Sequence, residues 1–375
     1  MTTTPVLSHT PSVHPPEAEL TETDHERLDR ARAEFDAEVI YLNTTTLGLP
    51  PRRSLAALRA VQEDWRAGTA DPREYDGPLN HARHRYAELV SVEPSAVAVG
   101  PQVSMFAGMI AASLRAGSEV LTAEGDFTSI LFPFHAQAGR GVTVRAVPLE
   151  RIADAVTART TLVSVSAVQS ANGHLADLDA LQAACAATGT RVLLDTTQAV
   201  GWLPIAAGRF DYTVCAGYKW LLAPRGTAFF TVRPDLWDQL VPNHAGWYAG
   251  EEPWSSIYGT PLRLAADARR FDLSPAWHSW IAAAPALDLL SEVGPAALHA
   301  HALGLAQRFR AAVGMPTSIS AIVSAVADEH VAELMKAAGI IGSVRAGRLR
   351  LSFHVSTSEQ DADQAAEVLA GHVRL

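Results

Sequence analysis

The sequence predicts an α/β fold with a large domain on a mainly parallel sheet, followed by a smaller α+β domain. Helical and extended patterns alternate through the first 270 residues, as parallel strands joined by crossover helices require. Near Phe271 the pattern changes to long helices rich in alanine and leucine. With 375 residues, 48% of them hydrophobic, the chain is long enough to bury the cores of two domains.

The elements of the first part follow from the spacing of their apolar residues. Apolar positions three and four residues apart indicate helices, as at Leu178, Leu181 and Cys185, and short apolar runs between turn residues indicate strands. The predicted helices are 25–35, 52–67, 104–114 and 178–188. The predicted strands are 97–99, 119–121, 142–147, 161–165, 192–194 and, antiparallel or at the sheet edge, 227–232.

The second part predicts helices 277–293 and 294–312, strands 318–323 and 348–353 with a helix between them, and a last helix 359–371. The N-terminal stretch has four prolines before Glu26 and no apolar core, which is typical of a disordered leader rather than a signal peptide. We therefore expect a leader at 1–24, a large domain at 25–270 and a small domain at 271–375, with the first helix free to pack on the small domain.

Composition excludes several classes of function. The net charge is −10 and no basic cluster with interleaved aromatic residues occurs, which argues against nucleic acid and anionic membranes as partners. No apolar run approaches the roughly 20 residues that span a bilayer. Two cysteines exclude a disulfide framework, and we predict no metal site. These features predict a cytoplasmic enzyme that acts on a small molecule.

The stretch RVLLDTTQAVGWLPIAAGRFDYTVCAGYKW, residues 191–220, carries the strongest functional signal. An apolar run brings Asp195 to a strand end, Gln198 follows, and a second short strand ends at Lys219. An acid, an amide and a lysine in these places indicate pyridoxal phosphate. The lysine can form a Schiff base with the aldehyde, and a carboxylate beside the pyridinium nitrogen keeps the ring protonated as an electron sink. Gln198 is placed to donate to the phenolic oxygen.

DTTQAVG matches the D-x-x-Q-x-x-G pattern of class V aminotransferase-like enzymes, and CAGYKWL lies where that family carries its Schiff-base lysine. The chain resembles this family from about Tyr41 to its C-terminus. The resemblance implies the aspartate-aminotransferase-like fold (fold type I) with a mainly parallel seven-stranded sheet. It also implies pyridoxal 5'-phosphate as cofactor and a homodimer.

Cofactor contacts follow from the same resemblance. A helix that opens at Val103 and Ser104 after a Gly100-Pro101 turn would bind the phosphate, since backbone N–H groups and the helix dipole favour an anion there. Tyr218, before the lysine, is similar to the kynureninase tyrosine that reaches the phosphate. Phe127 would stack on the ring. Ser170 occupies the position where relatives have an asparagine near the phenolic oxygen.

Substrate contacts are expected from two further segments. RLSFHVST resembles the family's R-x-S-x-H-x-Y-x-T block, in which Arg350 would form a bidentate pair with the substrate α-carboxylate. YLNTTTLG resembles the family's N-terminal segment, in which Asn43 and Thr44 would line the substrate side. The loop 243–264 lies where relatives reach across to the partner's phosphate, and Thr260 is the residue expected to make this cofactor contact.

The absence of a cysteine in the predicted small domain limits which reaction of the family the protein can catalyse. Cysteine desulfurases need a nucleophilic cysteine in the small domain, and no cysteine follows Cys215. Phe127, Tyr218 and Trp247 favour the branch of kynureninases, isopenicillin-N-epimerase-like proteins and C–S lyases, although Ile130 replaces the kynureninase aspartate. We expect a lyase for an α-amino acid with a β-leaving group, such as a cysteine S-conjugate.

Two alternatives remain open. One is an aminotransferase, epimerase or decarboxylating deaminase of specialised-metabolite biosynthesis, for example in a lincosamide-type antibiotic pathway. The other, from a different class, is an inactive binding protein on the same fold, against which the intact residues Asp195, Gln198, Lys219 and Arg350 argue.

Overall fold

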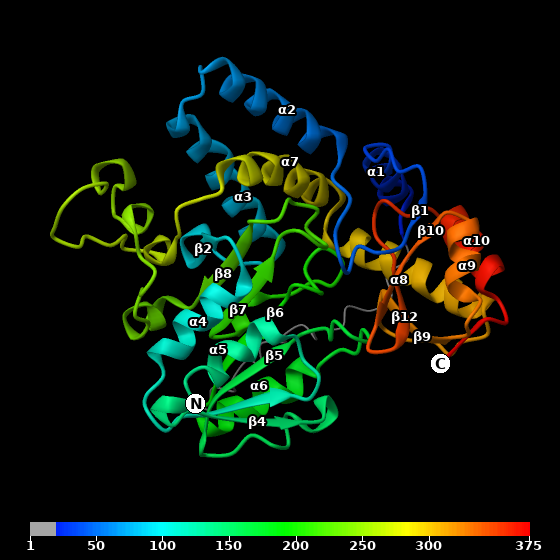
Figure 1. Cartoon of the computed structure of the whole chain (residues 1–375). Coiled ribbons are helices and arrows are strands. Elements are labelled where there is room, and N and C mark those ends of the chain that lie inside the picture. The colour runs from blue at the N-terminus through cyan, green and yellow to red at the C-terminus, as the bar shows by residue number, and fades with distance from the viewer. Residues whose placement is uncertain (1–19) are drawn as a thin grey trace, which may run out of the picture.

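A computed structural model of the chain describes residues 20–375 (Figure 1). The leader predicted at 1–24 lies outside the described residues as far as residue 19, and its last residues are helical. Helix α1 (Glu22–Arg32) begins there because Thr21 and Asp24 form a reciprocal capping box. The prediction of disorder is therefore wrong for Glu22–Asp24.

The large domain is built on a seven-stranded sheet in the order β2-β8-β7-β6-β5-β3-β4. Only β8 runs against its neighbours, and it lies between β2 and β7 rather than at the edge. This confirms the mainly parallel seven-stranded sheet. The strands are β2 (Val97–Gly100), β3 (Glu119–Ala123), β4 (Thr143–Val147), β5 (Thr160–Ser166), β6 (Arg191–Asp195), β7 (Tyr212–Ala216) and β8 (Ala228–Val232).

Helices cover both faces of the sheet because alternate strand residues point to opposite sides, as Leu193 and Leu194 do. One face packs against α3 (Asp76–Leu89), α6 (Leu178–Thr188) and α7 (Trp277–Val293). The other packs against α4 (Val103–Ser113) and α5 (Phe132–His135). Helix α2 (Arg52–Ala67) packs on α7 above the sheet (Figure 1).

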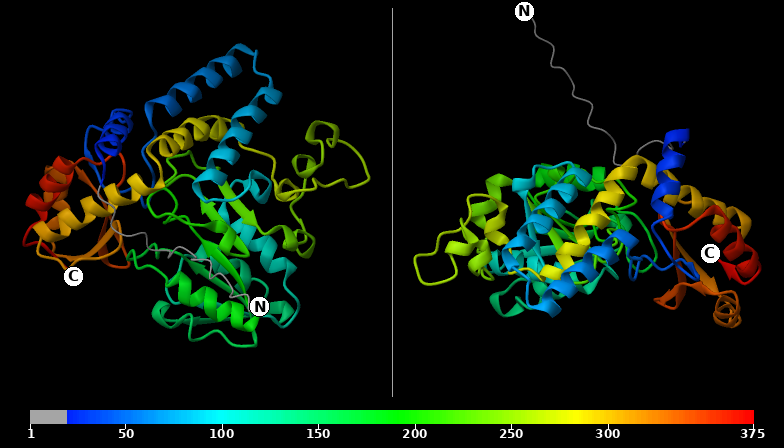
Figure 2. Two further views of the ribbon diagram at one scale, coloured as in Figure 1. Left: turned by 180° about the vertical axis from the view of Figure 1, so that it is seen from behind. Right: turned by 90° about the horizontal axis from the view of Figure 1, so that it is seen from above.

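The small domain lies beside the sheet, as both views of Figure 2 show. Its antiparallel strands have the order β11-β12-β9-β13. Strands β1 and β10 pair in parallel and join the start of the chain to it. Its elements are α8 (Pro295–Ala312), β9 (Ile322–Ala327), α9 (Val331–Ala337), β10 (Ile340–Ile341), β11 (Ser343–Arg345), β12 (Arg348–Ser352), α10 (Glu359–Leu369) and β13 (Val373–Arg374), with β1 (Ile40–Tyr41).

Two sequence predictions for this part need comment. The strand predicted at 318–323 begins only at Ile322, because the Arg310 guanidinium binds the carbonyls of Ser320 and Ile322 and holds the preceding segment as a loop. The domain boundary at 270/271 stays a prediction. By its packing α7 belongs with the large sheet, whereas α8 leads into the small domain, and α1 contacts both helices.

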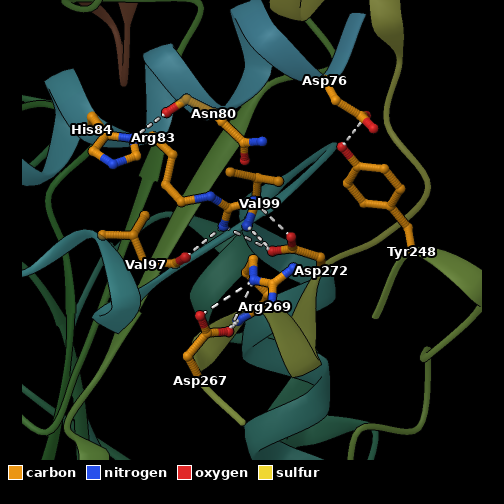
Figure 3. A network of polar contacts seen from close by, with 10 residues as sticks. All are labelled: Asp76, Asn80, Arg83, His84, Val97, Val99, Tyr248, Asp267, Arg269 and Asp272. Atoms are coloured by element: carbon orange, nitrogen blue, oxygen red, sulfur yellow. Dashed lines mark hydrogen bonds and ion pairs between the residues drawn. The ribbon is translucent and has the colours of Figure 1, made fainter. Parts of the chain in front are cut away.

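A buried ion pair fixes the strand that leads to the predicted phosphate helix (Figure 3). Arg83 on α3 binds both carboxylate oxygens of Asp272, at 3.1 and 2.7 Å, and also the carbonyl of Val97. Asp272 in turn accepts a hydrogen bond from the backbone N–H of Val99. Helix α3, strand β2 and the segment before α7 are thus tied together at one point.

Among residues 20–375 no single helix is long and apolar enough to cross a bilayer. Helices α7 and α8, which are bent by 83° at the break between them, reach the required length and apolar content only when they are taken together.

Candidate active site

A cavity of about 240 Å³ lies at the carboxyl ends of the parallel strands. Ligands bind at this edge in open α/β sheets because strands end there and loops diverge. Most of the residues that line it end or follow β2, β3, β5, β6 and β7, and two lie in the turn before β8. The lining residues are Pro101, Gln102, Val103, Ser104, Phe127, Ser129, Ser166, Ser170, Asp195, Thr197, Gln198, Ala216, Tyr218, Lys219, Arg225 and Gly226.

Asp195 is the last residue of β6 and is 5% exposed. Its carboxylate accepts a hydrogen bond from the backbone N–H of Thr197 at 2.8 Å. Burial raises the pKa of this carboxyl to about 6, because the charged form loses its hydration. A positively charged partner in the cavity would restore the ionised state, as a pyridinium nitrogen does.

Lys219 follows β7 and is also 5% exposed. Burial lowers the pKa of its amine to about 8, and the charge of Asp195 offsets part of that shift. The Nζ atom lies 5.2 Å from the centroid of the Phe127 ring and 5.8 Å from that of Tyr218. Phe127 is 43% exposed and lines the cavity, so its ring is accessible to a flat ligand there.

Gln198 is held by the protein on both sides of its amide. Nε2 donates to the Thr45 carbonyl and to Ser170 Oγ, both at 3.0 Å, and Oε1 accepts from the Trp220 indole. Donation to a phenolic oxygen would replace one of these bonds. The glycine of the pattern, Gly201, has φ +114°, and a side chain there would meet the Trp220 carbonyl. The pattern therefore holds Trp220 and the neighbouring Lys219 in place.

The predicted phosphate end is formed by the first turn of α4. Val103 and Ser104 open this helix at the cavity, with Gln102 before them and Tyr218 beside them. Arg225 also lines the cavity, with its guanidinium 4.5 Å from the centre of the Tyr218 ring. No pattern in the sequence singles out Arg225, because it lies in a turn outside the family motif.

Arg350 reaches the cavity through Ser170. Its guanidinium is 1% exposed and donates to the Ser170 carbonyl, to Ser170 Oγ at 3.1 Å and to Thr46 Oγ1 at 2.9 Å. Its Nε has no hydrogen-bond partner, and within residues 20–375 it forms no ion pair. A buried arginine without an acid is rare in proteins, and a substrate carboxylate would supply the missing charge.

The remaining predicted residues lie outside the cavity. Asn43 is a turn residue whose carbonyl accepts from Thr46 and Leu47, and Thr44 is buried. The neighbours Thr45 and Thr46 make the contacts with Gln198 and Arg350 instead. Thr260 is exposed on the loop 243–264, away from the cavity of its own chain, so its contact with a partner stays a prediction.

These residues fit pyridoxal 5'-phosphate: a buried amine, a carboxylate that forms no ion pair within residues 20–375, a partly exposed aromatic ring and a helix N-terminus meet in one cavity. Sequence reasoning missed Ser129, Ser166, Thr197 and Arg225, which line the same space. Among the described residues no group of three or more His, Cys, Asp or Glu side chains is placed to hold a metal ion.

Comparisons with known proteins agree with this geometry. The chain is 28% identical to the uncharacterized aminotransferase YcbU of Bacillus subtilis, covering 77% of this chain and 82% of the relative. It is 29% identical to isopenicillin N epimerase of Streptomyces clavuligerus, covering 72% and 74%.

In fold, the chain is similar to the cystine C-S lyase C-DES solved with cysteine persulfide, with a TM-score of 0.79 and 21% identity over 90% of this chain and 98% of that one. This neighbour confirms the fold type I architecture. The family model named Aminotransferase class-V matches residues 80–335. The chain therefore belongs to the class V aminotransferase family, whose enzymes use pyridoxal 5'-phosphate.

Proposed function

We propose that the protein is a lyase that removes the β-substituent of an α-amino acid, such as a cysteine S-conjugate, by β-elimination. The observation that carries the proposal is a cavity that holds a buried amine, Lys219, and no thiol, with the buried guanidinium of Arg350 behind Ser170 and without an ion pair among the described residues. Among the residues that line the cavity, Lys219 carries the one amine, and burial lowers the pKa of that amine toward neutrality.

Each residue has a defined task in this reaction. When bound, pyridoxal phosphate supplies an aldehyde for the substrate amino group and a ring that accepts the electron pair of the α-carbon. Arg350 would bind the α-carboxylate and thereby fix the orientation of the bonds at the α-carbon. Lys219 would take the α-proton, and Asp195 would hold the ring nitrogen protonated. The C–S bond then breaks, the thiolate leaves, and water converts the remaining product to a 2-oxo acid and ammonia.

Both cysteines are unsuited to a desulfurase mechanism. Cys185 on α6 and Cys215 on β7 are buried, and burial raises the pKa of each thiol to about 12. A thiol of this kind is neither ionised nor accessible at neutral pH. This supports elimination over sulfur transfer to the protein.

The relatives keep a second candidate open. Because isopenicillin N epimerase matches over most of its length, an epimerase, aminotransferase or decarboxylating deaminase of an antibiotic pathway is the alternative. The same family fold serves all these reactions, so the products must decide. The inactive binding protein is disfavoured by the intact cavity.

The test is a product balance on S-substituted cysteines with no added keto acid. We expect thiol, ammonia and 2-oxo acid in equal amounts, no turnover by Lys219→Ala, and largely retained turnover by Cys185→Ala with Cys215→Ser. A requirement for an added keto acid would indicate an aminotransferase, and racemised substrate without net loss would indicate an epimerase. Alanine with persulfide, lost in the cysteine variant, would indicate a desulfurase.

We further propose that the enzyme is a cytoplasmic homodimer. Large apolar residues are exposed on the loop 243–264, namely Tyr258 (92%), Leu262 (73%) and Ile257 (40%). Exposed apolar groups that cluster on one loop favour a protein partner, and in this family a second copy supplies it.

A further inference from the structure

Two arginines of the small domain meet at one hydroxyl beside the cavity. Arg350 donates to Thr46 Oγ1 at 2.9 Å and Arg345 donates to the same atom at 3.3 Å. Like charges held this close repel each other. Burial and then the charge of Arg345 lower the pKa of Arg350 to about 10. The arrangement is unfavourable unless an anion lies nearby.

A tight hairpin fixes the position of Arg345. Strands β11 and β12 are antiparallel, with Ser343 opposite Arg350 and Arg345 opposite Arg348, so these four side chains share one face of the sheet. The turn residues Ala346 and Gly347 have φ values of +48° and +75°, typical of a two-residue hairpin turn. Arg345 therefore stands at the exposed tip, two residues along the strand from the position opposite Arg350.

The same face holds polar groups without partners. Ser343 Oγ is buried and has no hydrogen bond to any residue from 20 to 375, and neither does Arg350 Nε. In the described part of the chain Arg345 forms no ion pair, although its positive charge contributes to the lowered pKa of Lys219. Asp195 is the acid expected at the cofactor ring, and Asp126 is held by Ser166 and Phe127. One α-carboxylate at Arg350 leaves the charge of Arg345 unbalanced.

We propose that the substrate carries a second anionic group on its side chain, and that Arg345 binds it at the mouth of the site. The inference rests on the proposed function, because it assumes that an amino acid binds at Arg350. The group is any small anion of carboxylate or sulfonate chemistry at the far end of the β-substituent. An exposed position suits the end of a substituent that extends away from the cofactor.

The experiment compares two substrates of equal size that differ in charge, S-carboxymethyl-cysteine and S-carbamoylmethyl-cysteine. Binding to the holoenzyme is followed by the absorbance change of the cofactor, and kcat/KM is measured separately. We expect the anionic compound to bind about tenfold more tightly, as one charge-assisted pair would provide. Added salt should reduce the difference, since the site is open to solvent.

The variants are Arg345→Gln, Arg345→Lys and, as control, Arg348→Gln. Arg348 lies opposite Arg345 on the hairpin but is held by Ser324, so its loss tests the hairpin and not the charge at the mouth. Arg345→Gln should abolish the difference in binding between the two compounds, Arg345→Lys should keep part of it, and Arg348→Gln should keep all of it.

Equal binding of both compounds by the wild-type protein, or a preference that survives Arg345→Gln, would overturn this inference and leave the proposed function intact. If neither compound changes the cofactor absorbance at any concentration, amino-acid binding itself fails and the proposed function falls with it.

Discussion

At the floor of the cavity, Asp195 and Lys219 are both deeply buried, and burial penalises the charged form of each. The pKa of the carboxyl is raised to about 6 and that of the amine is lowered to about 8. A neutral amine attacks an aldehyde and abstracts a proton, so the lowered pKa of Lys219 is the property that the chemistry needs.

The pH dependence of cofactor loading tests this pKa. Only the unprotonated Lys219 amine reacts with the aldehyde, so loading of the apoprotein should speed up as pH rises through about 8. A freely solvated lysine would place the midpoint of this pH dependence at about 10.4. Asp195→Asn removes the negative charge that raises the Lys219 pKa, so its midpoint should lie lower still. Stopped-flow absorbance measures the rate, and a wild-type midpoint above about 10 would contradict the account.

Asp195→Asn should also reduce turnover of the loaded enzyme. The variant keeps the volume of the side chain but loses the charge that holds the ring nitrogen protonated. We expect a loss of about 100-fold or more in rate, since one strong charge interaction in a dry site is worth a few kcal/mol. Cofactor content should be measured alongside, and activity within a factor of two of wild type would assign this role to another group.

Residues in an extended pattern could be predicted from sequence, whereas isolated contacts could not. Asp195, Gln198 and Lys219 belong to one stretch and lie together as expected. Arg225 lies in a turn and Thr46 in an irregular segment, where the local sequence carries no periodicity, and Arg345 ends the three-residue strand β11. That Asn43 and Thr44 line the substrate side stays a prediction, and the next residues of the same turn, Thr45 and Thr46, bind Gln198 and Arg350.

Among the elements of the fold, the Arg83–Asp272 pair holds strand β2, which leads to the predicted phosphate helix α4. Asp272→Asn would leave the Arg83 charge buried without its counter-charge, which costs about 3–5 kcal/mol. Urea unfolding should show this loss. Asp267→Asn is the matched control five residues away. Its partner Arg269 is a third exposed, so we expect less than about 1 kcal/mol. An equal loss in the free energy of unfolding for the two variants would show that the buried ion pair stabilises the fold no more than the exposed one.

Where a helix has a clear C-terminal signal, the sequence predicts both of its ends to the exact residue. α2, α6 and α7 each end before a glycine with positive φ, namely Gly68, Gly189 and Gly294. Helix α3 was missed, because its sequence begins with Asp, Gly and Pro and its buried face is defined by its tertiary partners, chiefly α7. Strands of two or three residues such as β1, β10 and β11 depend on their partners in the same way.

At the scale of the whole molecule, the loop 243–264 projects from the large domain (Figure 1). We expect the holoenzyme to have about twice the chain mass of 40.0 kDa in light scattering at micromolar concentration. Tyr258→Asp with Leu262→Asp should weaken the dimer, because charges at exposed apolar contacts oppose burial. A wild-type mass near that of one chain would contradict this prediction.

The central claim is that Lys219 binds the cofactor, and the composition of the chain allows a direct test. The sequence contains two lysines, Lys219 in the cavity and Lys336, which is exposed on α9 of the small domain. Borohydride reduction of the yellow holoenzyme, followed by peptide mass mapping, shows which amine carries the cofactor. The account predicts a pyridoxyl label on the Lys219 peptide alone, lost in Lys219→Ala; a label on Lys336, or none in protein saturated with cofactor, would contradict it.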